Sequence, residues 1–158
     1  MSIFKQYLLM KPSLRMMIEW PILIGVGIVG TISSQSMIPF YPITNIFGIV
    51  ILSIGFIIHG SSHKIHKRAH EQAEKIEKIV TSGIYSKIRH PGYLGLILIY
   101  WGFAVSWGMI WILIPVIIFS TLTCLTAIEE EKFLKKKFGK EYEEYMRRVP
   151  WRFIPKVF

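Results

Sequence analysis

The sequence predicts an all-α integral membrane protein of one domain, with about four transmembrane helices, a cytosolic connecting helix and a C-terminal amphipathic helical segment. Hydrophobic residues make up 52% of the 158 residues, and they are clustered rather than spread. Between Met16 and His63 only Glu19 is charged. No charged residue occurs from Pro91 to Ile128. Because a span needs about 20 apolar residues, each of these two stretches can hold two spans.

The first apolar stretch follows an N-terminal segment, residues 1–17, that we expect to lie at the membrane interface. Two spans are predicted within residues 18–62. The prolines and aromatic residues of 39–42 form a turn pattern that divides them. We therefore expect one helix near 18–38 and a second near 43–62.

Residues 63–91 are predicted to form a cytosolic connection after the second span. A helix is expected over 63–80, because residues of opposite charge recur four positions apart there, as Glu71 and Lys75 do. The small and flexible residues of 81–83 are expected to end that helix.

Residues 92–128, as one straight helix, would be about 55 Å long at about 1.5 Å per residue. That length is nearly twice the hydrocarbon core of about 30 Å. Two short spans, over 92–107 and 109–128 with a turn at Gly108, fit the bilayer better.

The C-terminal segment, residues 129–158, alternates charged residues with apolar residues that share one helical face. It is predicted to lie in the cytosol as two helices broken at Gly139. The second helix is expected over 140–148, where Arg147 and Arg148 suit a helix C-terminus.

Four spans place the N-terminus, residues 63–91 and residues 129–158 on one side of the membrane, and all 19 Lys and Arg residues lie in these segments. The positive-inside rule makes that side cytoplasmic, so both termini are expected there. The net charge of +9 is then explained by contact with anionic lipid headgroups. Nucleic-acid binding is not expected, because the charge follows the ends of the spans instead of forming an independent basic domain.

A dinucleotide-like pattern, Gly25-x-Gly27-x-x-Gly30, lies inside the first predicted span. No strand precedes it, so the structural context that this fingerprint requires is absent. Close packing of small residues between helices is the preferred interpretation.

Four histidines, at positions 59, 63, 66 and 70, are spaced to share one helical face. Such a stripe could bind a transition metal. The alternative is a polar stripe that extends the second span into the cytosol. Since nothing else in the chain completes a metal site, no metal is predicted.

Two polar clusters flank the predicted hairpin: Arg89 and His90 lie at its start, and Glu130 and Glu131 follow its end. Charged residues at a bilayer boundary are costly unless something binds them, and the hairpin would bring both clusters to one membrane face. Pro91 suits the first position of a helix, which leaves free backbone N–H groups that favour an anion. A pocket with a carboxylate-binding and an ammonium-binding side would fit a free amino acid moiety. Snorkelling charges with an interfacial salt bridge are the alternative.

Two motifs resemble those of the isoprenylcysteine carboxyl methyltransferase family, to which the phospholipid methyltransferases are related. The first is similar to the family signature GxYxxxRHPxYxG and consists of Thr81-Ser82-Gly83-Ile84-Tyr85-x-x-x-Arg89-His90-Pro91-x-Tyr93-x-Gly95. The second resembles the family's C-terminal half and consists of Glu130-Glu131-x-x-Leu134-x-x-x-Phe138-Gly139-x-x-Tyr142-x-x-Tyr145-x-x-Arg148-Val149-Pro150. The match covers about residues 76–155, half of the chain.

This resemblance implies an integral-membrane methyltransferase that uses S-adenosylmethionine. The residues that it implies for cofactor binding are His90, Tyr93, Glu130, Glu131, Tyr85 and Arg89. The residues that it implies as catalytic, at the methyl acceptor, are Arg148, Glu130 and Tyr145. The neighbouring Glu129, Arg147 and Arg152 leave open which acid and which arginine act.

The acceptor is expected to be a membrane lipid or a prenylated molecule, with the carboxylate of a prenylcysteine or similar isoprenoid acid preferred. A carboxylate is already ionised at pH 7, whereas a phospholipid amine, the first alternative, must lose a proton before it reacts. A membrane reductase that uses NADPH is a second alternative, because sterol reductases share a similar RHPxY element. A non-catalytic His-rich membrane protein is a third. The sequence does not indicate an oligomeric state.

Overall fold

The computed structural model describes residues 3–10, 12–33, 37–65 and 77–157 of the chain. The α-helices of this part are α1 (Ile3–Leu8), α2 (Pro12–Ile32), α3 (Ile43–Ile65), α4 (Pro91–Trp107), α5 (Leu113–Phe138) and α6 (Lys140–Arg148). Two short 3₁₀ helices, η2 (Gly83–Ser86) and η3 (Ile110–Ile112), precede α4 and α5. The described residues contain no β-strand, and an isolated bridge pairs Met37 with Met109.

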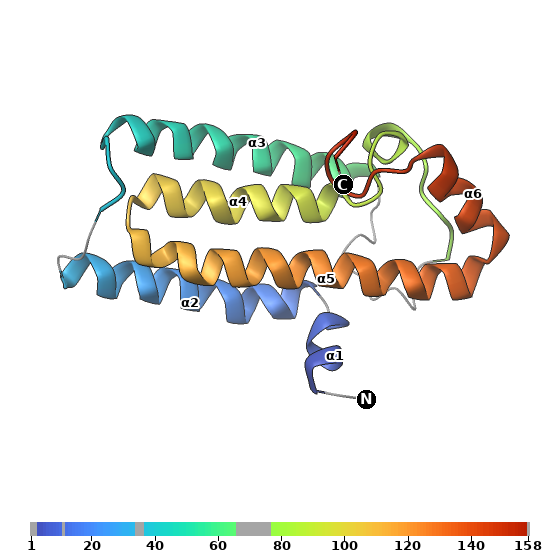
Figure 1. The fold of residues 1–158 in the computed structure, drawn as a ribbon, viewed down its shortest axis with the longest axis horizontal. Helices are drawn as coiled ribbons and strands as arrows, with labels where there is room; N and C mark the ends of the chain where they lie inside the picture. The colour runs from blue at the N-terminus through green and yellow to red at the C-terminus, as the bar shows by residue number, and fades with distance from the viewer. Residues whose placement is uncertain (1–2, 11, 34–36, 66–76, 158) are drawn as a thin grey trace.

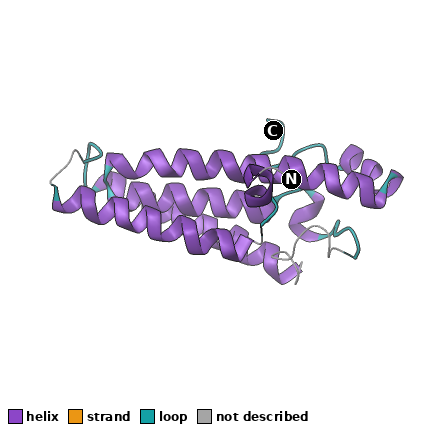
Figure 2. Ribbon diagram, turned by 90° about the horizontal axis from the view of Figure 1, so that it is seen from below, coloured by secondary structure: helices purple, strands orange, loops and turns teal. Residues whose placement is uncertain are grey.

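The long helices α2, α3, α4 and α5 run side by side along the long axis of the molecule, and α6 lies at one end (Figure 1). The turned view in Figure 2 shows the same elongated, helical bundle. Three described helical segments are long and apolar enough to cross a membrane, namely Leu14–Ile32, Ile43–Ile65 and Ile110–Phe138. The helix α4 is also apolar but has 17 residues. The predicted all-α integral membrane fold is therefore confirmed.

The turn between α4 and α5 lies at Gly108, as the sequence predicts. Gly108 has a φ of 83° and donates its N–H to the carbonyl of Ala104, which ends α4. A residue with a Cβ is strained in this left-handed conformation, so glycine fits the turn. The hairpin returns α5 to the end of the bundle where α4 begins (Figure 1).

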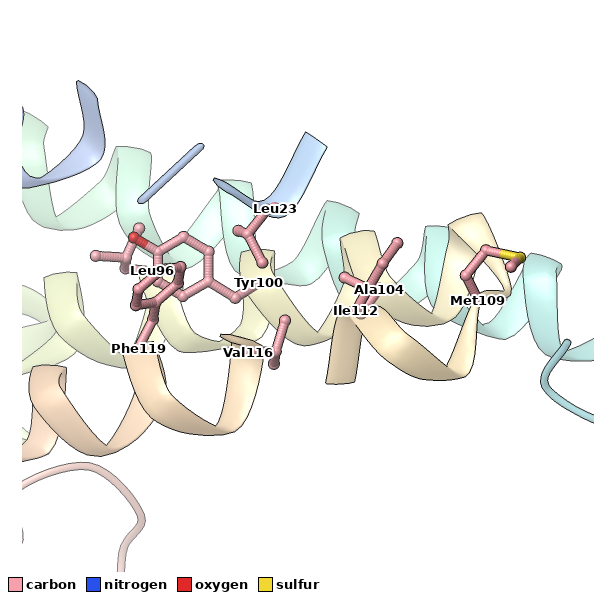
Figure 3. Close-up of a cluster of buried hydrophobic side chains, with 8 residues drawn as sticks. All are labelled: Leu23, Leu96, Tyr100, Ala104, Met109, Ile112, Val116 and Phe119. Carbon is pink, nitrogen blue, oxygen red and sulfur yellow. The ribbon is translucent and has the colours of Figure 1, made fainter. Parts of the chain in front are cut away.

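The main hydrophobic core lies between α2, α4 and α5 (Figure 3). Aromatic side chains extend it, because Trp20 of α2 packs edge-to-face on both Tyr100 and Phe103 of α4. The buried members of this core are Leu23, Leu96, Tyr100, Ala104, Met109, Ile112, Val116 and Phe119. The core fixes how α4 and α5 lie relative to α2.

The contact between α3 and α4 is so close that no Cβ would fit at four glycines. Gly48 and Gly55 on α3, and Gly95 and Gly102 on α4, are each seven residues apart, so each pair shares one helix face. A Cβ built on Gly95 would lie 2.6 Å from the backbone nitrogen of His59. Small residues let membrane helices approach in this way.

The helix predicted over 63–80 is wrong at its C-terminal end. The helix α3 continues to Ile65, but residues 77–80 are not helical. Residues 66–76, which include Glu71 and Lys75, lie outside the described residues. Ion pairs four residues apart stabilise a helix by only about 0.2–0.5 kcal/mol each, which does not form a helix without packing.

Two further boundaries differ from the prediction. The first membrane helix begins at Pro12 and ends at Ile32, instead of spanning 18–38, because Pro12 takes the first helical position, where its missing N–H costs nothing. At the other end, α5 continues through residue 128 to Phe138 without a break, since good helix formers such as Glu and Lys follow. The continuous helix holds Glu130 and Glu131 rigidly beside the start of α4.

Candidate active site at the start of α4

The start of α4 is fixed by a pairing with the C-terminal tail. Pro91 is the first residue of the helix and His90 its N-cap, with a φ of −122° and a ψ of 57°. The backbone N–H of Arg89 donates to the carbonyl of Trp151, and that of His90 to the carbonyl of Arg152, both at 2.9 Å. These two bonds place residues 151–152 directly beside the RHP segment.

Three side chains from the paired segments lie within hydrogen-bond distance of the Glu131 carboxylate. Arg89 Nε lies 2.7 Å from Oε1, His90 Nε2 lies 3.1 Å from Oε1, and Arg152 Nε lies 2.9 Å from Oε2. Arg89 and His90 are each 6% exposed and Glu131 is 3% exposed, whereas the side chain of Arg152 is 28% exposed. Two arginines on one carboxylate leave an excess of positive charge that reaches the surface at Arg152.

The neighbouring acid, Glu130, faces a different partner. The hydroxyl of Tyr93, on the first turn of α4, donates to Glu130 Oε2 at 2.7 Å. The ring of Tyr93 stacks on that of His90, with centroids 5.6 Å apart and an interplanar angle of 18°. Stacking therefore joins the Tyr93–Glu130 pair to the Glu131 cluster.

Tyrosines of η2 and α6 form hydrogen bonds close to the cluster. The hydroxyl of Tyr145 donates to the carbonyl of Tyr85 at 2.8 Å, and the hydroxyls of Tyr85 and Ser62 lie 2.7 Å apart. Burial raises the pKa of both tyrosines, so their hydroxyls stay protonated. The Arg89 Nη1 group donates to the carbonyl of Val149 at 2.7 Å, which ties the end of α6 to the same place.

Most of the predicted site residues are brought together here. The first group, in direct contact with one another, comprises Arg89, His90, Tyr93, Glu130 and Glu131. Tyr85 and Tyr145 are not in this group, but they are joined to each other by a hydrogen bond. Arg148 is different, because its side chain is exposed at the end of α6, as is that of Arg147.

Sequence reasoning missed the position of Arg152. Backbone pairing of the tail with residues 89–90 cannot be read from periodicity, so the sequence does not show where Arg152 lies. The sequence signal that could have indicated the position of Arg152 is its place between two aromatic residues, Trp151 and Phe153. Phe153 is buried, and the centroid of its ring lies 6.0 Å from that of His90. Aromatic anchors on both sides of a charged residue indicate a tail that folds back.

The histidine stripe is only partly described. His59 Nδ1 lies 2.9 Å from the carbonyl oxygen of Gly92, and His63 Nε2 lies 3.2 Å from His59 Nε2. His66 and His70 fall outside the described residues. Within the part of the chain that the structure describes, no three His, Cys, Asp or Glu residues are grouped as a metal site would require.

In the site, cationic and anionic side chains lie next to each other at one end of the apolar helix bundle. Arg89, His90 and Arg152 can donate to an anionic group, and the carboxylate of Glu130 can accept from an ammonium. Apolar helices beneath these groups can hold a lipophilic molecule. The arrangement therefore suits a reaction between a charged, water-soluble molecule and a lipid.

Comparison with known proteins gives a family for this arrangement. The model of the phospholipid methyltransferase family matches residues 43–141, which include both polar clusters. Protein-S-isoprenylcysteine O-methyltransferase B of Arabidopsis thaliana is 32% identical over 113 residues, which are 66% of this chain and 56% of that protein. A probable protein-S-isoprenylcysteine O-methyltransferase of Oryza sativa subsp. indica is 32% identical over 108 residues, 66% of this chain and 54% of that protein.

A Delta(14)-sterol reductase of Mus musculus is also similar, with 30% identity over 83 residues, 51% of this chain and 20% of the reductase. The chain thus spans just over half the length of the plant methyltransferases and a fifth of that reductase.

Proposed function

The chain belongs to the phospholipid methyltransferase family, and from this premise we propose that it transfers a methyl group from S-adenosylmethionine to a lipophilic acceptor at the membrane. The observation that carries the proposal is the convergence of Arg89, His90 and Arg152 on Glu131, next to the Tyr93–Glu130 pair. This set of donors and acceptors suits the free amino acid end of S-adenosylmethionine, which has one carboxylate and one ammonium group. Arg89, His90 and Arg152 would hold the carboxylate and Glu130 the ammonium.

When bound, S-adenosylmethionine supplies a methyl group on a sulfonium: the acceptor atom bonds the methyl carbon, the carbon–sulfur bond breaks, and its electron pair stays on sulfur. The protein's own residues orient the reactants and exclude water. Burial of Arg89, His90 and Glu131 supports this, because a site closed to solvent strengthens each electrostatic contact.

The acceptor that we propose is the carboxylate of a prenylcysteine or a similar isoprenoid acid. Such an acceptor needs no general base, since it is ionised at neutral pH. A phospholipid amine must lose a proton before it reacts. The names of the plant relatives favour the carboxylate acceptor.

A second candidate, reduction of a sterol-like lipid with NADPH, is favoured by the similarity to the sterol reductase. The phosphates of NADPH would also suit arginine side chains. The two functions differ in the molecule that binds at Arg89, His90 and Arg152.

Calorimetric titration of the detergent-purified protein tests the proposal. We expect saturable binding of S-adenosylmethionine and S-adenosylhomocysteine, and loss of both in His90→Ala and Glu130→Gln. The matched control is Glu129→Gln, since Glu129 is adjacent in sequence but pairs with Lys5 and Lys132 instead. Binding of NADPH without S-adenosylmethionine by the folded wild type would overturn the methyltransferase proposal in favour of the reductase.

A further inference from the structure

A second polar cluster lies inside the bundle, among the apolar side chains of α2, α4 and α5. Arg15 and Glu19 are one turn apart on α2, and they are 3% and 0% exposed. Arg15 Nη2 lies 3.0 Å from Glu19 Oε1. The side chains that contact this pair come from three other helices and are Tyr7, Tyr100, Thr123 and Thr126.

Stability alone explains this cluster poorly. Taking two charges out of water costs several kcal/mol for each ion, and replacing a buried ion pair by packed apolar residues is often neutral or stabilising. Of the helices around the pair, α2 and α5 are apolar and long enough to span the membrane. Ionisable residues inside a membrane bundle are retained mainly where they bind or move something.

The cluster lies directly beneath the methyl-transfer site. On α5, Thr126 precedes Glu130 by one turn, which places it about 6 Å deeper on the same face. On α4, Tyr100 follows Tyr93 by two turns on the same face. Arg15 is therefore the next charged group that a lipid head would meet below Glu130 and Tyr93.

The two charged side chains of the pair differ in how readily their hydrogen-bond partners could be replaced by a ligand. The Glu19 carboxylate accepts from Tyr7 at 2.7 Å, from Tyr100 and from Arg15, so each of its oxygens has a strong donor. The Nη1 group of Arg15 donates to a neutral hydroxyl, and Nη2 donates to a second neutral hydroxyl as well as to Glu19.

These hydroxyls belong to Thr126, at 2.6 Å, and Thr123, at 3.3 Å. Both already donate to carbonyls of their own helix. A hydrogen bond to an ionised acceptor is about twice as strong as one to a neutral acceptor. An anionic oxygen would therefore displace the threonines from Arg15.

The short helix α1 covers the cluster from the outside. The ring of Tyr7 lies over Arg15, with Cζ 5.2 Å from its centroid. The outer side chains of α1, Ile3 and Phe4, are 85% and 52% exposed, as expected for a helix in contact with lipid. Displacement of Tyr7 would open Arg15 to the membrane interface.

We propose that Arg15 binds the anionic oxygen of the lipid acceptor, a carboxylate or a phosphate, and forms the inner wall of the acceptor site. This inference rests on the proposed function, because it assigns the acceptor of the same reaction. If the acceptor is a carboxylate, forming the methyl ester removes the charge that Arg15 binds. Arg15 then favours the substrate over the product.

The test is equilibrium binding of matched lipids to the detergent-purified chain without S-adenosylmethionine. One pair is N-acetyl-S-farnesylcysteine and its methyl ester; the other is dioctanoyl phosphatidylethanolamine and dioctanoylglycerol. We expect the wild type to bind the member that carries the carboxylate or phosphate group of one pair at least tenfold more tightly, and that pair identifies the source of the anionic oxygen. In Arg15→Gln/Glu19→Gln, which removes both charges together, this preference should be lost while the neutral lipid binds as before.

Equal binding within both pairs by the wild type, or a preference retained in the double variant, would overturn the inference. If the double variant does not fold, Arg15→Lys decides, because an ammonium lacks the planar fork of a guanidinium and should reduce the preference. An unchanged preference in Arg15→Lys would then contradict the role of Arg15. Failure to bind S-adenosylmethionine would instead count against the proposed function, since these titrations do not contain it.

Discussion

At the scale of single residues, Glu131 joins segments that are far apart in the sequence. Arg89 and His90 reach its carboxylate from the start of α4, and Arg152 reaches it from the tail. Hydrogen bonds to a charged group contribute about 1.5–3 kcal/mol each, which is enough to hold the tail over the site.

The two candidate arginines can be told apart by substitution. Arg152→Ala should lower the methyl-transfer rate by about tenfold or more, because it removes a charge-assisted hydrogen bond worth about 1.5–3 kcal/mol from Glu131. Arg148→Ala should leave the rate within about twofold, since its side chain is exposed on α6. Initial rates with both variants at equal folded concentration measure this, and the reverse order would contradict the assignment to Arg152.

Sequence reasoning could find part of this residue-scale picture. The meeting of Arg89 and His90 with Glu130 and Glu131 follows from the hairpin, because two spans of similar length return the chain to the same face. The position of Arg152 depends on backbone pairing in an irregular tail. The contacts of Glu19 with Tyr7 and Tyr100 depend on how three helices pack, which charge spacing along one helix does not show.

At the scale of elements, the seam of glycines between α3 and α4, formed by Gly48, Gly55, Gly95 and Gly102, sets how closely these two helices pack. The seam glycines recur every seven residues on each helix, a period that the sequence carries, whereas the Gly25-x-Gly27-x-x-Gly30 pattern lies on α2. Of those three, Gly25 lies on an open face, with nothing within 4 Å of where its Cβ would be. A Cβ on Gly27 would lie 2.9 Å from the side chain of Trp107 and one on Gly30 3.2 Å from that of Met109, so these two glycines allow close packing.

Substitutions on α3 test the seam. Gly55→Ala should destabilise the protein by about 1–3 kcal/mol, because its Cβ would lie 2.8 Å from the backbone nitrogen of Ile99. Gly60→Ala on the same helix is the matched control, with nothing within 4 Å, and should be neutral or stabilising by up to about 1 kcal/mol. Unfolding in a denaturing detergent gives both values. Equal stability of the two variants would show that α3 and α4 are less closely packed.

The docking of α6 should depend on alkaline pH. Burial raises the pKa of Tyr142 and of Tyr145 above the ordinary value of 10.0. A raised pKa in the folded state means that the stability from these phenols is complete below about pH 10 and falls as pH rises above that value. Thermal unfolding between pH 8 and 11.5 measures the loss. We expect a smaller loss in Tyr142→Phe, and an identical pH profile would argue against burial of this phenol.

At the scale of the whole molecule, the predicted fold class agrees with the structure because clustered apolar residues and the glycine turn are local patterns. The orientation in the membrane stays a prediction from the positive-inside rule. In a Cys124→Ser background, Ser82→Cys and Lys156→Cys should react with an impermeant maleimide only from the cytoplasmic side. Phe40→Cys, at the opposite end of the bundle, should react only from the other side. Labelling of all three from one side would refute the topology.

The most direct test of the central claim is methyl transfer itself. The purified chain, reconstituted with N-acetyl-S-farnesylcysteine and methyl-labelled S-adenosylmethionine, should form labelled, lipid-extractable product. Glu130→Gln should reduce this product by at least tenfold, while Glu129→Gln should match the wild type. No labelled lipid from folded wild-type protein, with either this acid or phosphatidylethanolamine as acceptor, would contradict the assignment as a lipid methyltransferase.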